Sequence, residues 1–137
     1  MNLLSPKKVK YRKVQKGYAY GTSRRAAKLS FGDFGLQVLN AHRLTAVQIE
    51  SVRVFLVRKL KKQGKFWLRV FPDIPVTAKP TEVRMGRGKG EIEYWMCRVK
   101  GNRIIVEIAN VTKSKAYNIL QGVAYKLPFK KYNIVQR

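Results

Sequence analysis

Acidic side chains are scarce in this sequence: 7 Asp and Glu stand against 30 Lys and Arg, which gives a formal net charge of +23 at pH 7. Charges this unbalanced repel one another and oppose compaction unless a polyanion neutralises them. Nucleic acid is the expected partner, because Lys and Arg displace the counterions that surround its phosphates. Solubility alone does not account for the charge, since a magnitude of about 2–8 is enough for a small domain.

Cysteine and histidine are rarer still, with Cys97 and His42 as the single copies. One cysteine excludes an intrachain disulfide and a cysteine-based zinc site, and it fits a reducing compartment. No serine lies in a Gly-x-Ser-x-Gly context, and His42 would be the only histidine available as a base. The sequence therefore predicts no metal site, no cofactor and no enzymatic activity.

Long hydrophobic runs are also missing. No stretch approaches the roughly 18 apolar residues of a membrane-spanning helix. The first residues (MNLLSPK) lack the apolar core of a signal peptide, and Leu3 and Leu4 are too little for a membrane anchor. We therefore expect no membrane partner and no removable leader.

Basic residues dominate the segment 1–28, which contains no acid. Proline and glycine interrupt any regular pattern there, and three tyrosines lie among the cations, where their rings can stack on bases. We predict an extended RNA-binding arm at 1–28, with a solvated disordered tail as the alternative, followed by a single globular domain at 29–137. The nine cations of the arm are Lys7, Lys8, Lys10, Arg12, Lys13, Lys16, Arg24, Arg25 and Lys28.

Helical periodicity is clearest after Thr45. Thr45 and Gln48 have the spacing of a capping box, in which each side chain satisfies a backbone amide of the other residue. A stripe of apolar residues follows at helical spacing, and Gly64 predicts that the helix ends near Gln63. A second helix is predicted to begin near Thr112 and to end before Pro128. The first helix carries its stripe at Ile49, Val52, Phe55, Leu56 and Leu60.

Strand patterns lie between and around these helices. We predict strands at 29–36, with a bend or bulge, and at 65–71 and 129–135. In the second of these, Trp67 lies on the face opposite Phe66 and is expected in the core rather than stacked on a base. The apolar runs 94–99 and 103–108 flank Gly101-Asn102 and predict a hairpin. The expected class is α+β.

Residues 84–90 (RMGRGKG) combine three glycines with three cations. Glycine at every second position lets this backbone take positive φ and approach a partner closely. The pattern is neither a Gly-x-Gly-x-x-Gly fingerprint nor a triphosphate loop, in which Ser or Thr must follow the lysine, because Lys89 is followed by Gly90. We therefore predict a flexible cationic loop that contacts an anionic partner.

Two motifs resemble the signatures of a known family. Residues 61–72 (KKQGKFWLRVFP) resemble one signature of bacterial-type large-subunit ribosomal protein sixteen, and the loop 84–90 followed by Glu93-Tyr94-Trp95 resembles the other. Shorter stretches extend the resemblance over nearly the whole chain. These are 5–8 (SPKK) with 11–13 (YRK), 31–36 (FGDFGL), 44–45 (LT) with 48–50 (QIE), and 124–128 (AYKLP).

The resemblance implies an α+β domain with two helices packed on antiparallel strands, with an extended basic N-terminal arm and a Gly-rich basic loop. It implies a structural constituent of the large ribosomal subunit that binds large-subunit rRNA and helps to shape the tRNA-binding cleft near the peptidyl transferase centre. Neighbouring large-subunit ribosomal proteins and tRNA are the other expected partners, without a homo-oligomer. A stand-alone RNA-binding or RNA-processing factor is the alternative.

Two groups of residues are expected to serve this function. The tRNA-cleft loop consists of Arg84, Met85, Gly86, Arg87, Gly88, Lys89 and Gly90. The cations expected to bind rRNA are Lys7, Lys8, Lys10, Arg12, Lys13, Lys16, Arg24, Arg25, Lys61, Lys62, Lys65 and Arg69.

The signatures fit bacteria, plastids and mitochondria alike. Lys outnumbers Arg by 18 to 12, and Asn, Ile and Tyr are frequent, which resembles the product of an AT-rich organellar genome. Together with the absence of a transit peptide, this composition favours a mitochondrial ribosome, with a plastid or the bacterial cytoplasm as alternatives.

Overall fold

Two α-helices and seven β-strands build the described part of the chain, residues 4–137, in the computed structural model. The helices are α1 (Ala46–Leu60) and α2 (Lys113–Ala124), and a 3-10 helix spans Arg25–Ala27. The strands are β1 (Phe34–Val38), β2 (His42–Thr45), β3 (Lys65–Leu68), β4 (Ile74–Ala78), β5 (Glu91–Val99), β6 (Arg103–Ala109) and β7 (Tyr132–Gln136). The predicted α+β class is confirmed. Residues 1–3 of the predicted arm lie outside the described residues.

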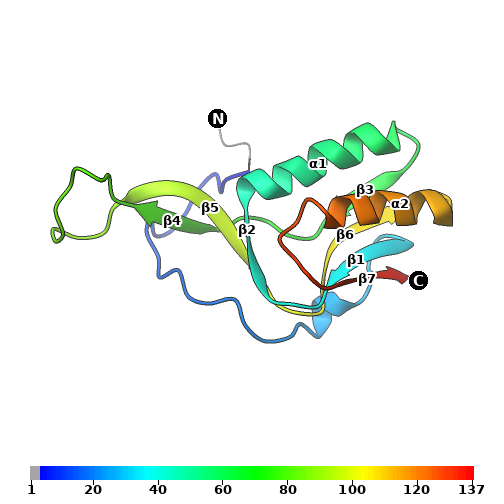
Figure 1. Cartoon of the computed structure of the whole chain (residues 1–137), viewed down its shortest axis with the longest axis horizontal. Helices are drawn as coiled ribbons and strands as arrows, with labels where there is room; N and C mark the ends of the chain where they lie inside the picture. The colour runs from blue at the N-terminus through cyan, green and yellow to red at the C-terminus, as the bar shows by residue number, and fades with distance from the viewer. Residues whose placement is uncertain (1–3) are drawn as a thin grey trace.

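The strands form two antiparallel sheets. One has four strands in the order β3-β6-β1-β7, and the other has three in the order β2-β5-β4. Figure 1 shows α1 and α2 packed side by side above the four-stranded sheet, while β4 and β5 extend away from it as a long hairpin. The fold thus has a helix-covered body and a projecting hairpin.

A large apolar core joins the helices to both sheets. In α1, four residues of the predicted stripe are buried, whereas Phe55 is only partly buried at the edge of this core. The central strands β1 and β6 are buried almost throughout, and together with the apolar face of α2 they supply the opposite walls. Members of the core from these elements include Leu36, Leu44, Val99, Val106, Ile108, Ala116, Leu120 and Val123.

The predicted start of α1 is confirmed, and its predicted end is wrong. The Thr45 side chain accepts from the Gln48 amide, and the Gln48 side chain accepts from the Thr45 amide, which completes the capping box. The helix ends at Leu60, because Lys61 takes the left-handed conformation at φ 46°. Gly64 serves close packing instead: an added Cβ would lie 2.6 Å from Val111.

The predicted hairpin around Gly101-Asn102 is also wrong. β5 and β6 follow one another in the chain but belong to different sheets, with β2 and β4 beside β5, and β1 and β3 beside β6. Gly101 is buried and bonds to the arm instead: its amide donates to the Gly21 carbonyl, and its carbonyl accepts from the Ser23 amide. The turn itself exists, with Asn102 at φ 61°, but it turns the chain from one sheet into the other.

Other boundaries differ from the pattern-based predictions. The first predicted strand begins only at Phe34, and its expected irregularity is a register shift between Leu36 and Gln37. The strand predicted at 65–71 ends at Leu68, and the second helix ends at Ala124. Two strands had no clear pattern, β2 because it is short and β4 because it contains Pro75; proline is tolerated there because β4 is an edge strand.

Candidate nucleic-acid interface

The glycine-rich loop is the tip of the β4–β5 hairpin. Residues 79–90 connect the two strands; of these, residues 79–89 are all exposed, and Met85 is fully so. Gly86 and Gly88 have φ of 103° and 85°, as the glycine pattern predicts, and Arg87 between them is also left-handed at φ 53°. The ammonium of Lys79, at the start of this connection, donates to the Gly86 carbonyl at 2.5 Å. The loop therefore presents its backbone and cations at the far end of the hairpin.

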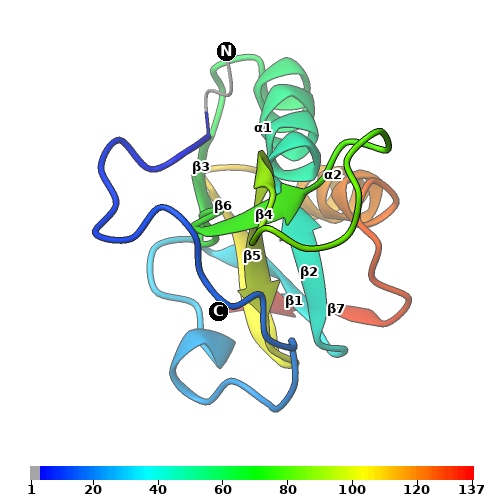
Figure 2. The same cartoon turned by 90° about the vertical axis from the view of Figure 1, so that its left-hand side faces the viewer.

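The arm and the loop lie together, although 75 or more positions separate them in sequence. The Lys13 ammonium donates to the Lys89 carbonyl at 2.8 Å, and the Lys89 ammonium donates to the Val14 carbonyl at 2.5 Å. Val14 also packs on a small apolar cluster of the three-stranded sheet, formed by Ile74, Val76 and Met96. Figure 2, viewed from the hairpin end, shows the blue arm passing beside β4 and β5.

Further contacts fasten the arm along the same sheet. The Arg43 guanidinium donates to the Gly17 carbonyl and lies 5.7 Å from the centre of the Tyr18 ring. Beyond this point, the bridge between Thr22 and Gly101 ties the arm to the turn that joins the two sheets. The eight arm cations predicted to bind rRNA are all exposed. Apart from the 3-10 helix and the bridge at Thr22, the described part of the arm has no helix or strand, and its cations are exposed along the path that these contacts hold.

The cations at the end of α1 occupy a different place. Lys61 and Lys62 are exposed in left-handed conformations after the helix, and Lys65 is exposed at the start of β3. Figure 1 shows this end of α1 on the right and the loop on the left, at opposite ends of the long axis. The predicted rRNA-binding cations therefore form two separate groups.

Arg69 differs from the other predicted cations, because it is paired inside the protein. Its guanidinium lies 2.6 Å from the Glu107 carboxylate, and the Arg69 side chain is only 17% exposed. The same guanidinium donates to the Lys28 carbonyl at 2.8 Å. The structure thus uses Arg69 to hold the chain at the end of the arm against β6.

The Glu107 carboxylate completes this attachment. It is fully buried and accepts from the amides of Gly32 and Phe31 at 2.7 Å each, and from Ser30 at 3.2 Å. Burial disfavours the charged form, but these amides and the Arg69 guanidinium outweigh it and lower the pKa of Glu107 below its ordinary value. Residues 30–32, predicted as part of a strand, instead wrap around this carboxylate.

Trp67 is not part of the large core. Its ring stacks on the exposed Phe31 ring, with centroids 6.0 Å apart and planes inclined by 24°, and the Arg69 guanidinium lies 5.8 Å from the centre of Phe31. The predicted core position for Trp67 is therefore wrong, because its side of β3 faces the chain that leaves the arm.

Chemically reactive groups do not converge in the described residues. Within residues 4–137, no three His, Cys, Asp or Glu side chains are grouped as metal ligands would be. Cys97 is buried, and burial raises the pKa of its thiol to about 11, so the sulfur is protonated at neutral pH. No helix in the same range has the length and apolar character needed to cross a membrane.

Cations from β2 and β5 join the arm, and sequence reasoning missed them. Arg43 holds Gly17 as described, and Arg98 lies so close to Gly17 that a Cβ there would come within 2.6 Å of its guanidinium. A signal for Arg98 was present: Arg98 and Lys100 alternate with the buried Cys97 and Val99, which places Arg98 on the outer face of β5 and Lys100 directly after the end of this strand.

Comparison with known proteins identifies the family. The family model for ribosomal protein L16p/L10e matches residues 6–135. Relatives include the large ribosomal subunit protein uL16 of Chelativorans sp. (strain BNC1), 52% identical over 93% of this chain and 93% of the relative. Those of Pelagibacter ubique and Psychrobacter cryohalolentis are 48% and 47% identical, again over 93% of this chain and over 94% and 93% of the relatives. This protein therefore belongs to the ribosomal protein L16p/L10e family.

Proposed function

We propose that this protein is a structural constituent of the large ribosomal subunit and binds its rRNA and neighbouring ribosomal proteins. The observation that carries the proposal is the joined arm and loop, in which Lys13 and Lys89 hold each other's backbone segments while the surrounding cations stay exposed. Such a surface can neutralise phosphate where RNA segments converge. Membership of a ribosomal protein family marks the chain as a structural protein rather than an enzyme.

The domain at 29–137 would hold two separate groups of cations, the arm and the end of α1, in place against rRNA. We assign contacts with rRNA phosphates to the eight arm cations. At the other end of the molecule, we assign such contacts to Lys61, Lys62 and Lys65. Arg69 acts through its ion pair by holding the end of the arm. Irregular RNA and its shape would guide placement, because side chains cannot read the deep major groove of A-form helices.

The loop 84–90 is assigned to the tRNA-binding cleft near the peptidyl transferase centre. Its support is its position at the tip of the hairpin, where three cations and a freely accessible backbone project beyond the body. The alternative of a stand-alone RNA-processing factor needs a group of catalytic side chains, and the buried, protonated Cys97 does not supply one.

Sedimentation tests the ribosomal role. In a sucrose gradient of the source lysate, we expect the protein to co-migrate with the large subunit and to remain there after a moderate-salt wash, since many phosphate contacts act together. Recovery as a free monomer under these conditions would contradict the proposal. A homo-oligomer at the top of the gradient would contradict the expectation that the protein forms none.

We further propose that this ribosome is mitochondrial. The support is the excess of Lys over Arg, 18 to 12, with frequent Asn, Ile and Tyr. The relatives described above come from bacteria, so they support the ribosome and leave the compartment to this compositional argument. Locating the gene in the mitochondrial, plastid or bacterial genome decides among the three compartments.

A further inference from the structure

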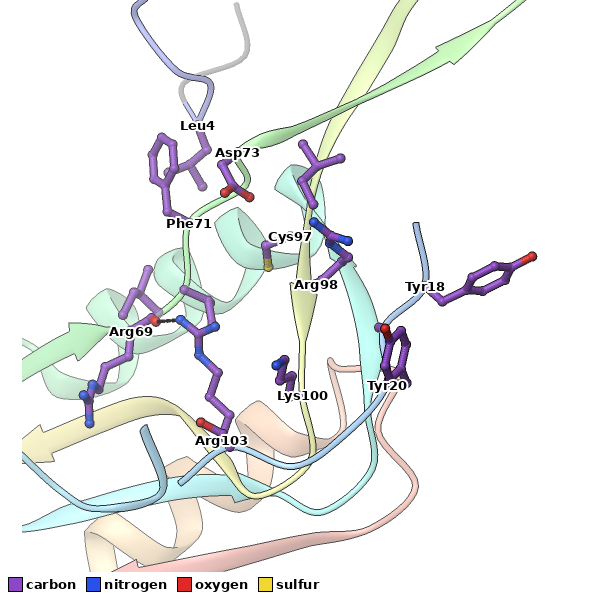
Figure 3. Close-up of a pocket in the computed structure, with 15 residues that line it drawn as sticks. Leu4, Tyr18, Tyr20, Arg69, Phe71, Asp73, Cys97, Arg98, Lys100 and Arg103 are labelled. Carbon is purple, nitrogen blue, oxygen red and sulfur yellow. Dashed lines mark hydrogen bonds between the residues drawn. The ribbon is translucent and has the colours of Figure 1, made fainter. Parts of the chain in front are cut away.

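A groove separates the arm from the body of the molecule. It has a volume of about 940 Å³ and is lined by residues 18–20 and 23 of the arm, by residues 68–71, 73 and 74, by the end of β5 and by Arg103 of β6. In Figure 3, the Arg103 guanidinium lies between Phe71 and Asp73 at one end and Lys100 at the other. The volume falls in the range of about 300–1,000 Å³ typical of ligand sites, and it is larger than a lone phosphate requires.

The groove carries an excess of positive charge. Arg98, Lys100 and Arg103 line it, and none of them forms an ion pair with a carboxylate in the described residues. Asp73 is the acidic residue among the lining side chains, and it leaves a net positive wall. This positive wall attracts anions, and phosphodiesters are anions that Arg and Lys side chains bind well.

Arg103 is held in the wall of the groove. One end of its guanidinium donates to the Arg69 carbonyl at 3.0 Å, which fixes the side chain, while its buried Nε has no hydrogen-bond partner within the described chain. The Arg103 guanidinium, fixed by this bond, therefore adds a positive charge to the wall of the groove.

Aromatic rings occupy the same groove. Tyr18, Tyr20 and Phe71 line it and are 80%, 75% and 49% exposed, so the core does not account for them. The arm that carries the two tyrosines is fastened on both sides, at Gly17 and at Thr22, which limits where these rings can lie. Unpaired bases stack on such rings, whereas the bases of a duplex are already stacked.

We propose that this groove binds an unpaired segment of rRNA, with phosphates against Arg98, Lys100 and Arg103 and a base stacked on Tyr20. The proposal rests on the rRNA-binding function above and adds a third contact between the two groups of cations already assigned. It also names the RNA form that is bound: a single strand rather than a helix.

The test uses the full-length protein and a labelled six-nucleotide single-stranded RNA, with fluorescence anisotropy at fixed salt. We expect the double variant Arg98→Gln/Lys100→Gln to weaken binding about tenfold and to reduce the log–log salt slope by about 1.4, since single strands give about 0.7 per contact. Tyr20→Ala should also weaken binding, by about tenfold, through lost stacking. An RNA duplex of equal length should bind less tightly than the single strand.

The matched control is Arg58→Gln/Lys59→Gln, which removes the same two residue types from the exposed face of α1. Equal losses in the groove and control variants would overturn the proposal and leave general rRNA binding intact, whereas no RNA binding by the unaltered protein would overturn both. Displacement of the RNA by millimolar inorganic phosphate, with no effect of Tyr20→Ala, would show a phosphate site only and would also overturn it. Circular dichroism confirms folding, which these exposed positions should not affect.

Discussion

Glu107→Gln should lower the free energy of unfolding by about 3–5 kcal/mol, the usual cost of breaking a buried ion pair. Glutamine would keep the shape of the side chain, but its amide nitrogen would face the amides of residues 30–32 or the Arg69 guanidinium, which are all donors. Denaturant unfolding of the RNA-free protein measures the change, with the slope expected to stay constant.

The protein contains its own control for this experiment. Glu50 pairs with Arg53 at 2.6 Å, the same distance as the Glu107–Arg69 pair, but it lies on the surface of α1. Glu50→Gln should therefore have little measurable effect. Equal effects of the two substitutions would show that the buried carboxylate does not fasten the end of the arm.

Acid should remove the difference in stability between the native protein and the Glu107→Gln variant. Because the folded protein lowers the pKa of Glu107, the ionised carboxylate adds stability above the ordinary Glu pKa of about 4.3. This contribution is lost as pH falls from there through the lower folded value, since the protonated carboxyl no longer pairs with Arg69. The difference in unfolding free energy between the native protein and Glu107→Gln should thus be constant near pH 7 and shrink below about pH 4.

Arg87→Ala/Lys89→Ala should weaken tRNA binding by large subunits that carry it by about tenfold or more, and reduce the log–log salt slope by about 1.8 for two lost phosphate contacts. The fold should be unaffected, because both side chains are fully on the surface of the loop. Unchanged tRNA affinity in properly assembled subunits would contradict the role of the loop.

The single variants Arg87→Ala and Lys89→Ala distinguish the loss of a positive charge from the loss of the hydrogen bond between the loop and the arm. Arg87→Ala removes only a charge, whereas Lys89→Ala also removes the hydrogen bond to the Val14 carbonyl. Hydrogen exchange of the amides around Val14 should therefore accelerate in Lys89→Ala and stay unchanged in Arg87→Ala. Equal exchange in both variants would mean that the Lys89 ammonium does not hold the arm, since the bond from Lys13 to the backbone carbonyl of residue 89 remains in both.

Local signals in the sequence were sufficient for several features. The capping box at Thr45 and Gln48 depends on residues three positions apart, and the buried stripe of α1 depends on one helical period. Gly86 and Gly88 of the loop adopt positive φ readily because they have no side chain. A short stretch of sequence is therefore enough to predict each of these features.

Features set by distant parts of the chain could not be read in this way. A turn at Gly101-Asn102 is compatible with a hairpin and with a change of sheet, and the arm residues Gly21 and Ser23 decide between them by bonding to Gly101. Similarly, Arg69 resembles the exposed cations around it until Glu107, 38 positions away, is placed beside it. The contact between Lys13 and Lys89 likewise exists only in the folded chain.

Ultraviolet cross-linking of purified large subunits, with the linked amino acids and nucleotides identified by mass spectrometry, tests most directly whether the arm and the loop form one RNA-binding surface. We predict that cross-links from the arm around Lys13 and from the loop around Lys89 fall on the same or adjoining RNA segments, because the two lysines are bonded to each other's backbone segments. Cross-links confined to the exposed faces of α1 and α2, or arm and loop links to widely separated RNA, would contradict it.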